Sequence, residues 1–329
     1  MSILVVGGAG YIGSHMVLEL LKSGEDVIVV DNLITGHKES VDKRAKLFIG
    51  DIKDKSFLRD VFSKNNINAV IDFAAYSLVG ESVNSPLKYF ENNVYGTICL
   101  LEVMVEFDVK SIVFSSTAAT FGEPEVSPIV EDVIKNPTNP YGESKLCVEK
   151  ILKWVDNAHG LKYAVLRYFN VAGADIDGKI GEAHTVETHI IPLVLKTAQG
   201  LRDKIMIFGD DYNTPDGTCI RDYIHVTDLC NAHQLALNHI QKNEISCTYN
   251  LGNGNGFSVK EIIQTCRKVT GIDFKEEVGE RRAGDPSTLV ASSEKITKEL
   301  GWKPKYNTLE QIIESAWLWH KANPMGYTK

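Results

Sequence analysis

The 329-residue chain lacks the features that mark membrane, secreted and nucleic-acid-binding proteins. No apolar run approaches the ~20 residues that a membrane-spanning helix requires. The first apolar segment begins at residue 2 and leaves no room for a signal peptide, so we expect a cytoplasmic protein. The formal net charge is −8, from 35 basic and 43 acidic residues, which gives no general attraction to nucleic acid or anionic lipid.

Cysteine pairs and common catalytic motifs are also missing. The six cysteines are scattered without a C-x-x-C pair, which predicts reduced thiols. The sequence contains no H-E-x-x-H, no G-x-S-x-G and no phosphate-binding P-loop. His184 and His189 are five residues apart beside Pro192, a poor spacing for metal ligands, so we expect no metal site.

What the chain does contain is a glycine-rich turn between two apolar segments. Residues 2–6 and 27–30 predict buried strands, and the second ends at Asp31. Between them lie an amphipathic stretch over 14–22 and four glycines, namely Gly7, Gly8, Gly10 and Gly13. They fit both G-x-G-x-x-G and G-x-x-G-x-x-G, the pattern of a dinucleotide-binding turn that receives a pyrophosphate at a helix N-terminus. An acid at Asp31 accepts hydrogen bonds from a ribose and repels a 2′-phosphate, which favours NAD over NADP.

Strand-like segments alternate with helical patterns as far as about residue 172. Expected strands cover 47–49, 69–73, 111–115 and 161–168, and expected helices cover 55–64, 92–107 and 141–157. This alternation predicts an α/β fold, a doubly wound parallel sheet of Rossmann type. Because ligands bind beyond the carboxyl ends of such strands, four polar residues near strand ends are candidate site residues: Asp31, Asp51, Thr117 and Asn170.

The second half has a different pattern and predicts a smaller, mixed domain that caps the sheet. We expect a loop over 173–188, a strand over 205–208, and helices over 188–200, 228–241, 258–270, 294–300 and 309–321. The chain is therefore divided into an NAD-binding domain at 1–172 and a second, mainly substrate-binding domain at 173–329. We expect the chain to cross between these domains more than once.

Tyr141 and Lys145 form a Y-x-x-x-K pair, whose side chains share one face of a helix. A free tyrosine has a pKa near ~10, and a neighbouring ammonium together with a positively charged nicotinamide favours the phenolate. Tyr141 is therefore a candidate general acid/base for the proton of a substrate hydroxyl, with Thr117 as a second hydrogen-bonding group. Outside this context, the simpler interpretation is a core tyrosine and a solvated lysine.

Motifs along nearly the whole chain resemble the extended short-chain dehydrogenase/reductase family. In the first half they are Gly7, Gly10 and Gly13, Asp31, residues 50–52, 79–82 and 115–117, the Tyr141/Lys145 pair, and residues 167–170. The second half narrows the resemblance to the branch that epimerises UDP-hexoses at C4, through residues 207–209, 216–218, 221–226, 281–282 and 284–285. The resemblance implies an isomerase with tightly bound NAD that interconverts UDP-glucose and UDP-galactose through a 4-keto intermediate, in galactose metabolism.

The resemblance also implies a role for each matching residue. Tyr141 would exchange the proton of the sugar 4-hydroxyl, and Lys145 would hold the nicotinamide ribose and lower the tyrosine pKa, with Thr117 as the third catalytic residue. Implied cofactor contacts are Gly7, Gly10, Tyr11, Ile12, Gly13, Asp31, Asn32, Asp51, Ile52, Phe73, Ala74, Asn92, Tyr141, Lys145 and Tyr168. Implied contacts of the UDP-sugar are Thr117, Tyr141, Asn170, His189, Phe208, Arg221, Tyr223, Arg282, Asp285 and Leu289. The two arginines suit a dianionic diphosphate.

The chain departs from this branch at three positions. Many epimerases place a lysine after the cofactor-site alanines, where residues 75–78 here are Ala-Tyr-Ser-Leu. His189 stands where many have an asparagine at the substrate diphosphate, and the charge of a histidine depends on pH. Leu289 falls on the gatekeeper of the sugar pocket and is intermediate in size, which leaves the use of UDP-N-acetylhexosamines open.

Two rival functions are weighed against epimerisation. Dehydratases and decarboxylases share the fold, but dehydratases usually follow the residue at 117 with an acidic pair, where this chain has Ala118 and Ala119. A silent NAD-binding protein would commonly lose the tyrosine–lysine pair, which this chain keeps. The family usually forms homodimers through a four-helix bundle, for which the expected helices at 92–107 and 141–157 are the candidates.

Overall fold

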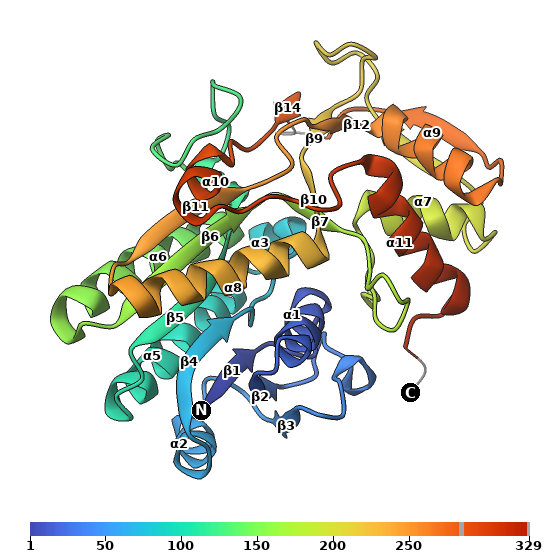
Figure 1. Cartoon of the computed structure of the whole chain (residues 1–329). Helices are drawn as coiled ribbons and strands as arrows, with labels where there is room; N and C mark the ends of the chain where they lie inside the picture. Colours follow the sequence, from blue (N-terminus) through green and yellow to red (C-terminus); the bar gives the residue numbers. More distant parts are fainter. Residues whose placement is uncertain (283–285, 328–329) are drawn as a thin grey trace.

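The apolar segments of the first half form one parallel sheet, and a later segment extends it (Figure 1). The computed structural model describes residues 1–282 and 286–327. Within these residues the sheet has the strand order β11-β6-β5-β4-β1-β2-β3, and all neighbours run parallel. Its strands are β1 (Ser2–Val6), β2 (Asp26–Asp31), β3 (Lys46–Ile49), β4 (Ile67–Asp72), β5 (Ser111–Thr117), β6 (Lys162–Tyr168) and β11 (Cys247–Leu251). The order reverses between β1 and β4, so their carboxyl ends border the crevice where such sheets bind ligands.

Helices cover both faces of this sheet. On one face Leu20 shares a hydrophobic core with Val5, and the helices there are α1 (Tyr11–Lys22) and α8 (Val226–Asn243). On the other face Leu100 shares a core with Val70, and the helices are α2 (Lys55–Lys64), α5 (Gly96–Glu106) and α6 (Pro140–His159). The predicted doubly wound α/β fold of Rossmann type is confirmed. None of the helices in the described part of the chain is long and apolar enough to cross a membrane.

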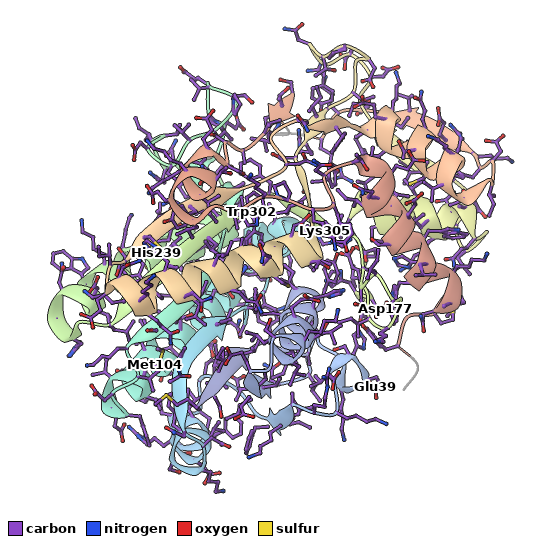
Figure 2. The ribbon with its side chains drawn as sticks, viewed as in Figure 1. Glu39, Met104, Asp177, His239, Trp302 and Lys305 are labelled. Atoms are coloured by element: carbon purple, nitrogen blue, oxygen red, sulfur yellow. The ribbon has the colours of Figure 1, made fainter. Side chains whose placement is uncertain are left out.

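Strand β11 and helix α8 join the sheet although they lie beyond residue 172. β11 is missing from the predicted strands because polar and apolar residues alternate in Cys247–Leu251, unlike the fully apolar strands beside it. Residues 302–305 are hydrogen-bonded to Asp228 in the first turn of α8 (Figure 2). The indole N–H of Trp302 donates to the carbonyl oxygen of Asp228 at 3.0 Å, and the backbone N–H of Lys305 donates to the Asp228 carboxylate at 2.8 Å. The division of the chain at residue 172 stays a prediction.

The expected helix over 92–107 begins earlier and is not uniform. Two short helices, α3 (Val79–Asn84) and α4 (Pro86–Tyr89), precede a π-helical stretch at Phe90–Tyr95, which continues into α5. Pro86 stands at the first position of α4, where a missing N–H costs nothing. A π-helical stretch carries no distinct hydrophobic period, so the pattern of 92–107 does not reveal it. Such stretches occur often at functional sites.

The rest of the second half forms a separate layer of helices and short strands, at the upper right of Figure 1. The helices α7 (Ile190–Ala198), α9 (Val259–Thr270) and α11 (Leu309–Ala322) share one core, and α10 (Glu294–Leu300) lies nearer the main sheet. The short strands pair as β7 (Asn170–Ala172) with β10 (Tyr223–His225), β8 (Ile205–Phe208) with β13 (Glu276–Gly279), and β9 (Ile220–Arg221) with both β12 (Phe257–Ser258) and β14 (Thr288–Leu289). Of these strands only β8 is predicted, because the two- and three-residue strands are too short to show a period, and the four residues of β13 are mostly exposed and do not form an apolar run.

Candidate active site

A cavity of about 570 Å³ lies along the carboxyl edge of the sheet, within the size range of small-molecule sites. It is lined by the glycine turn after β1, by the ends of β2, β4, β5 and β6, and by residues between 182 and 189. The predicted site residues that line it are Gly7, Gly10, Tyr11, Ile12, Gly13, Asp31, Asn32, Ile52, Phe73, Ala74, Asn92, Thr117, Tyr141, Lys145, Tyr168, Asn170 and His189. The structure therefore brings nearly all the predicted cofactor residues and the whole predicted catalytic set to one cavity.

The glycine turn is tight enough that side chains could not replace its hydrogens. Gly7 has φ +73°, and a Cβ there would lie 2.8 Å from the backbone nitrogen of Ala74. A Cβ on Gly13 would lie 2.1 Å from the carbonyl oxygen of Gly7. Gly10, the N-cap of α1, offers no side chain to the first N–H groups of the helix. The turn thus holds a helix N-terminus against the cavity, where it suits a pyrophosphate.

Asp31 ends β2 inside the cavity and is buried. Its carboxylate oxygens accept the backbone N–H groups of Ala9 at 2.9 Å and Leu33 at 2.8 Å. Burial raises the pKa of Asp31 above its ordinary value, and these two hydrogen bonds act in the opposite direction. Each oxygen keeps a lone pair for a ribose hydroxyl. Asp51 does not line the cavity and accepts the backbone N–H of Lys53 at 2.9 Å, whereas Ile52 beside it does.

Tyr141 and Lys145 sit on the first turns of α6, as the Y-x-x-x-K spacing predicts. The helix begins there because Asn139 caps it, accepting the backbone N–H of Gly142 at 2.9 Å. Lys145 is buried and donates from Nζ to the carbonyl oxygen of Ser115 at 2.8 Å. Burial lowers the pKa of Lys145 to about 8, against the opposing effects of nearby carboxylates.

The Tyr141 hydroxyl is hydrogen-bonded to Thr117 at the end of β5. Burial raises the pKa of Tyr141 above its ordinary value, and the hydrogen bond from Thr117 only partly offsets this. The expected lowering of the tyrosine pKa by Lys145 is therefore not found in this structure, because Nζ turns to the Ser115 carbonyl and burial dominates. The phenol is neutral at pH 7.

A buried ion pair supports the catalytic strand end, and sequence reasoning missed it. Arg167 on β6 donates from Nε and Nη2 to the two carboxylate oxygens of Glu149 on α6, at 2.9 and 2.6 Å. The Ser116 hydroxyl donates to the same carboxylate at 2.5 Å. Glu149 lies one helical turn after Lys145, and this spacing is the signal that could have shown that both face the sheet.

Asn93 ties the π-helical stretch to both walls of the cavity. Its side-chain oxygen accepts the backbone N–H of Tyr76 at 2.9 Å, and its Nδ2 donates to the Ser144 hydroxyl on α6 at 3.1 Å. The neighbouring Asn92, which lines the cavity, donates to the same Asn93 oxygen at 3.0 Å. Below them Asp72 is fully buried, and burial raises its pKa to about 6. Sequence reasoning found Asn92 but missed Asn93 and Asp72.

Apart from His189, the predicted substrate residues of the second half that the structure describes lie outside this cavity lining. Arg221 pairs with Leu289 across β9 and β14, and Tyr223 pairs with Asn170 across β10 and β7. The Arg282 guanidinium lies 3.9 Å from the centroid of the Phe208 ring. Asp285 lies outside the described residues.

Asp222 lies between the short strands β9 and β10 and is hydrogen-bonded to two other segments of the second half. Its buried carboxylate accepts the backbone N–H groups of Asn253 at 2.6 Å, Gly254 at 3.0 Å and Ala291 at 3.0 Å. Burial raises the pKa of Asp222 in spite of these bonds. Through Asp222 the short strands next to Asn170 are connected to the segment that follows Leu289.

Two histidines that the spacing argument set aside come together in the cavity wall. His184 and His189 lie with Glu182 and Glu187 so that one ligand atom from each falls within 4.8 Å of all the others. The sequence spacing does not reveal this cluster, because the residues belong to an irregular segment before α7, where helical periodicity does not apply. The expectation of no metal site stays a prediction.

Known proteins resemble the chain over its whole length. Residues 3–252 match the model of the NAD dependent epimerase/dehydratase family. The UDP-glucose 4-epimerase of Streptococcus mutans is 58% identical over 329 residues, which cover 99% of each chain. A crystal structure of UDP-glucose 4-epimerase has a TM-score of 0.99 and 59% identity and covers 100% of both chains. The UDP-glucose 4-epimerase of Bifidobacterium longum, in complex with NAD⁺ and UDP, has a TM-score of 0.94 and 40% identity and covers 99% of this chain and 100% of the other. From the glycine turn, the Tyr141–Thr117–Lys145 arrangement and these likenesses, it follows that the chain belongs to the NAD dependent epimerase/dehydratase family, among the UDP-glucose 4-epimerases.

Proposed function

We propose that this chain interconverts UDP-glucose and UDP-galactose by epimerisation at C4, with tightly held NAD as its cofactor. The observation that carries the proposal is the Tyr141–Thr117 hydrogen bond beside buried Lys145, in the same cavity as the glycine turn and Asp31. The family and the curated relatives agree with this activity.

The cavity fits NAD at its sheet end. The glycine turn and the α1 N-terminus suit the pyrophosphate, and Asp31 has lone pairs for the adenosine ribose. Ile52 and Phe73 supply apolar walls, and Asn92 stands beside the turn that carries Ala74. When bound there, NAD supplies a reversible hydride acceptor for C4 of the sugar, which passes through a 4-keto form.

The chain itself handles the proton of the sugar 4-hydroxyl. Tyr141 Oη is the atom that takes and returns this proton. The Thr117 side chain is hydrogen-bonded to Tyr141 and keeps it in place. Because burial raises the tyrosine pKa, phenolate formation needs positive charge close by. Lys145 is mostly protonated at neutral pH, since its pKa is about 8, but it does not lower the tyrosine pKa by itself, so the positively charged nicotinamide of bound NAD would have to add to its charge.

The UDP-sugar is held from the other end of the cavity. Asn170 and His189 reach it from the cavity wall. Arg221 and Arg282, in the layer of short strands, neutralise the charge of the diphosphate. Asp285 holds the uridine ribose. Leu289 limits the size of the sugar that can bind. Phe208 and Tyr223 are the remaining proposed contacts of the UDP-sugar.

We also propose a homodimer in the cytoplasm. Its supporting observation is a set of exposed apolar side chains on α6 and the segment it contacts: Val83, Leu87, Tyr95 and Trp154 are between 48% and 80% exposed. Exposed apolar side chains on neighbouring elements are typical of an interface. Sedimentation of the wild type and of Trp154→Lys at micromolar concentration tests it, with a dimer expected only for the wild type. A monomeric wild type contradicts the interface.

The activity is tested by adding UDP-galactose to purified protein without NAD and measuring UDP-glucose. Tyr141→Phe is expected to abolish conversion, and UDP-N-acetylgalactosamine added in parallel shows whether Leu289 admits the larger sugar. Conversion that appears only when NAD is added means that the cofactor is held weakly, without a lysine among residues 75–78. Absence of product even with NAD contradicts the proposed function.

A further inference from the structure

Two histidines and two glutamates lie together between residues 182 and 189, and all but Glu187 line the cavity. Glu182 Oε1 lies 2.7 Å from His189 Nδ1 and 3.2 Å from His184 Nδ1. The two oxygens of Glu187 lie 3.1 Å from His189 Nδ1 and 3.4 Å from His184 Nδ1. In a tetrahedral zinc site with bonds of ~2.0–2.1 Å, the ligand atoms lie ~3.3 Å apart. Three of the four observed carboxylate–imidazole distances lie within about 0.2 Å of that value, and the fourth, 2.7 Å, is shorter.

One of these ligand atoms is buried without a hydrogen bond. Glu182 is 4% exposed, and its Oε1 accepts no properly oriented hydrogen bond within the described residues, although it faces both imidazole nitrogens. Both nitrogens are instead within hydrogen-bonding range of Glu187. Glu182 Oε1 therefore meets the two imidazoles at ion-pair distance but without a well-oriented hydrogen bond. It is one of four ligand atoms that all lie within 4.8 Å of one another.

The cluster is held in place by contacts of its backbone with neighbouring elements and by one hydrogen bond to a Glu187 oxygen. The Trp319 indole donates to the carbonyl oxygen of Glu182 at 3.3 Å, and His37 Nε2 lies 2.7 Å from the carbonyl oxygen of Ala183. Glu187 Oε1 accepts the backbone N–H of His189, the N-cap residue of α7, at 2.8 Å. These contacts join the segment to α11, to the loop after β2 and to the start of α7, so the ligand set is largely preformed.

We propose that Glu182, His184, Glu187 and His189 bind one zinc ion, as a four-ligand site in the wall of the cavity. Imidazole nitrogens and carboxylate oxygens are ordinary zinc ligands, and four protein ligands leave no open position for catalysis. The ion therefore has a structural role: it locks the segment 182–189, which lines the cavity, to the start of α7. This inference does not depend on the sugar chemistry.

The experiment uses tag-free protein freed of metal with a chelator and then titrated with zinc chloride. Isothermal titration calorimetry measures the stoichiometry and the affinity together. The expected result is one ion per chain. X-ray absorption at the zinc edge of the wild type is expected to show nitrogen and oxygen ligands at ~2.0–2.1 Å.

Glu187→Gln is the decisive variant, because Glu187 does not line the cavity and its amide keeps the shape of the carboxylate. Its zinc affinity is expected to fall at least a hundredfold, and His184→Ala is expected to behave alike. His239→Gln is the matched control: this partly exposed histidine lies on α8 (Figure 2), outside the cluster, and its removal should change nothing. Zinc that binds sub-stoichiometrically, or that binds Glu187→Gln as tightly as the wild type, would overturn the site. Because none of these measurements uses a sugar substrate, failure here is distinct from failure of the epimerase proposal.

Discussion

The two ends of the cavity are built in different ways. At the cofactor end, Asp31 and Thr117 come from two strands of one sheet and Lys145 from the helix after the second of them, and each is held by a hydrogen bond inside the protein. At the proposed substrate end, outside the cavity lining, Arg221 and Leu289 come from strands of two residues in a separate layer. A parallel sheet gathers the ends of its strands by topology alone, whereas the second layer needs contacts between segments far apart in sequence.

The two ends also differ in how deeply their charged side chains are buried. At the cofactor end Lys145, Asp72 and Glu149 are buried, and they pair with carbonyls, hydroxyls or an opposite charge. At the substrate end Arg282 is exposed and stacks on a half-exposed Phe208. We therefore expect substitutions at the cofactor end to affect both turnover and stability, and substitutions at the substrate end to affect mainly the apparent affinity for the UDP-sugar.

The largest effect is expected for Tyr141→Phe. Losing the hydroxyl removes the only proposed proton carrier for the 4-hydroxyl, and general acid/base groups contribute ~10²–10⁴-fold to turnover. We expect kcat to fall by about that factor while the amount of bound NAD stays unchanged, as measured by release of the cofactor on denaturation. Tyr163→Phe, a tyrosine outside the cavity lining, is the control and should keep full turnover. Wild-type turnover in Tyr141→Phe would remove the proposed base.

The next effect is on stability and concerns the buried pair under the catalytic strand. Glu149→Gln leaves the Arg167 guanidinium buried without its counter-charge, and breaking such a pair typically costs ~3–5 kcal/mol. Denaturant titration should show a loss of that size in the free energy of unfolding. Asp60→Asn breaks the exposed pair with Lys64 and should cost less than about 1 kcal/mol. Equal losses in the two variants would mean that Glu149 has no special role.

The same contrast explains which parts of the fold and of the site could be predicted from the sequence alone. The strands, the glycine turn and Tyr141/Lys145 are predictable because each depends on residues close together in the chain. Asn93 and Asp222 are not predictable, because their hydrogen-bond partners lie 17 to 69 residues away in the chain and no local pattern reveals them. The cluster around Glu182 is hidden for the same reason: its segment has no period, and only the contacts to α11 and α7 bring the side chains together.

A pH titration of stability sharpens the account of Lys145. The pKa of Lys145 is about 8 in the folded chain and ~10.4 when unfolded, so between these values the unfolded chain binds more protons. Stability from this residue therefore rises as pH increases from about 8 to 10.5, by at most about 3 kcal/mol. The test is the difference in unfolding free energy between the wild type and Lys145→Met across that range. Other groups, including the tyrosines, titrate in both proteins and cancel. A constant difference across the range would show that the folded lysine has an ordinary pKa.

The smallest effect is expected at the substrate end, where Arg221→Ala should raise the KM for UDP-galactose about 10–100-fold, the range for losing one charge-assisted hydrogen bond of ~1.5–3 kcal/mol. Turnover and bound NAD should stay near the wild-type values, because Arg221 lies outside the cavity lining that holds the catalytic residues. Arg281→Ala is the matched control: its guanidinium bonds Asp211 at 2.6 Å and stacks on Tyr212, so its loss should leave KM unchanged. If Arg221→Ala instead lowered turnover and cofactor content with no change in KM, the two ends of the cavity would be coupled through Asp222, and the separation drawn between them would fail.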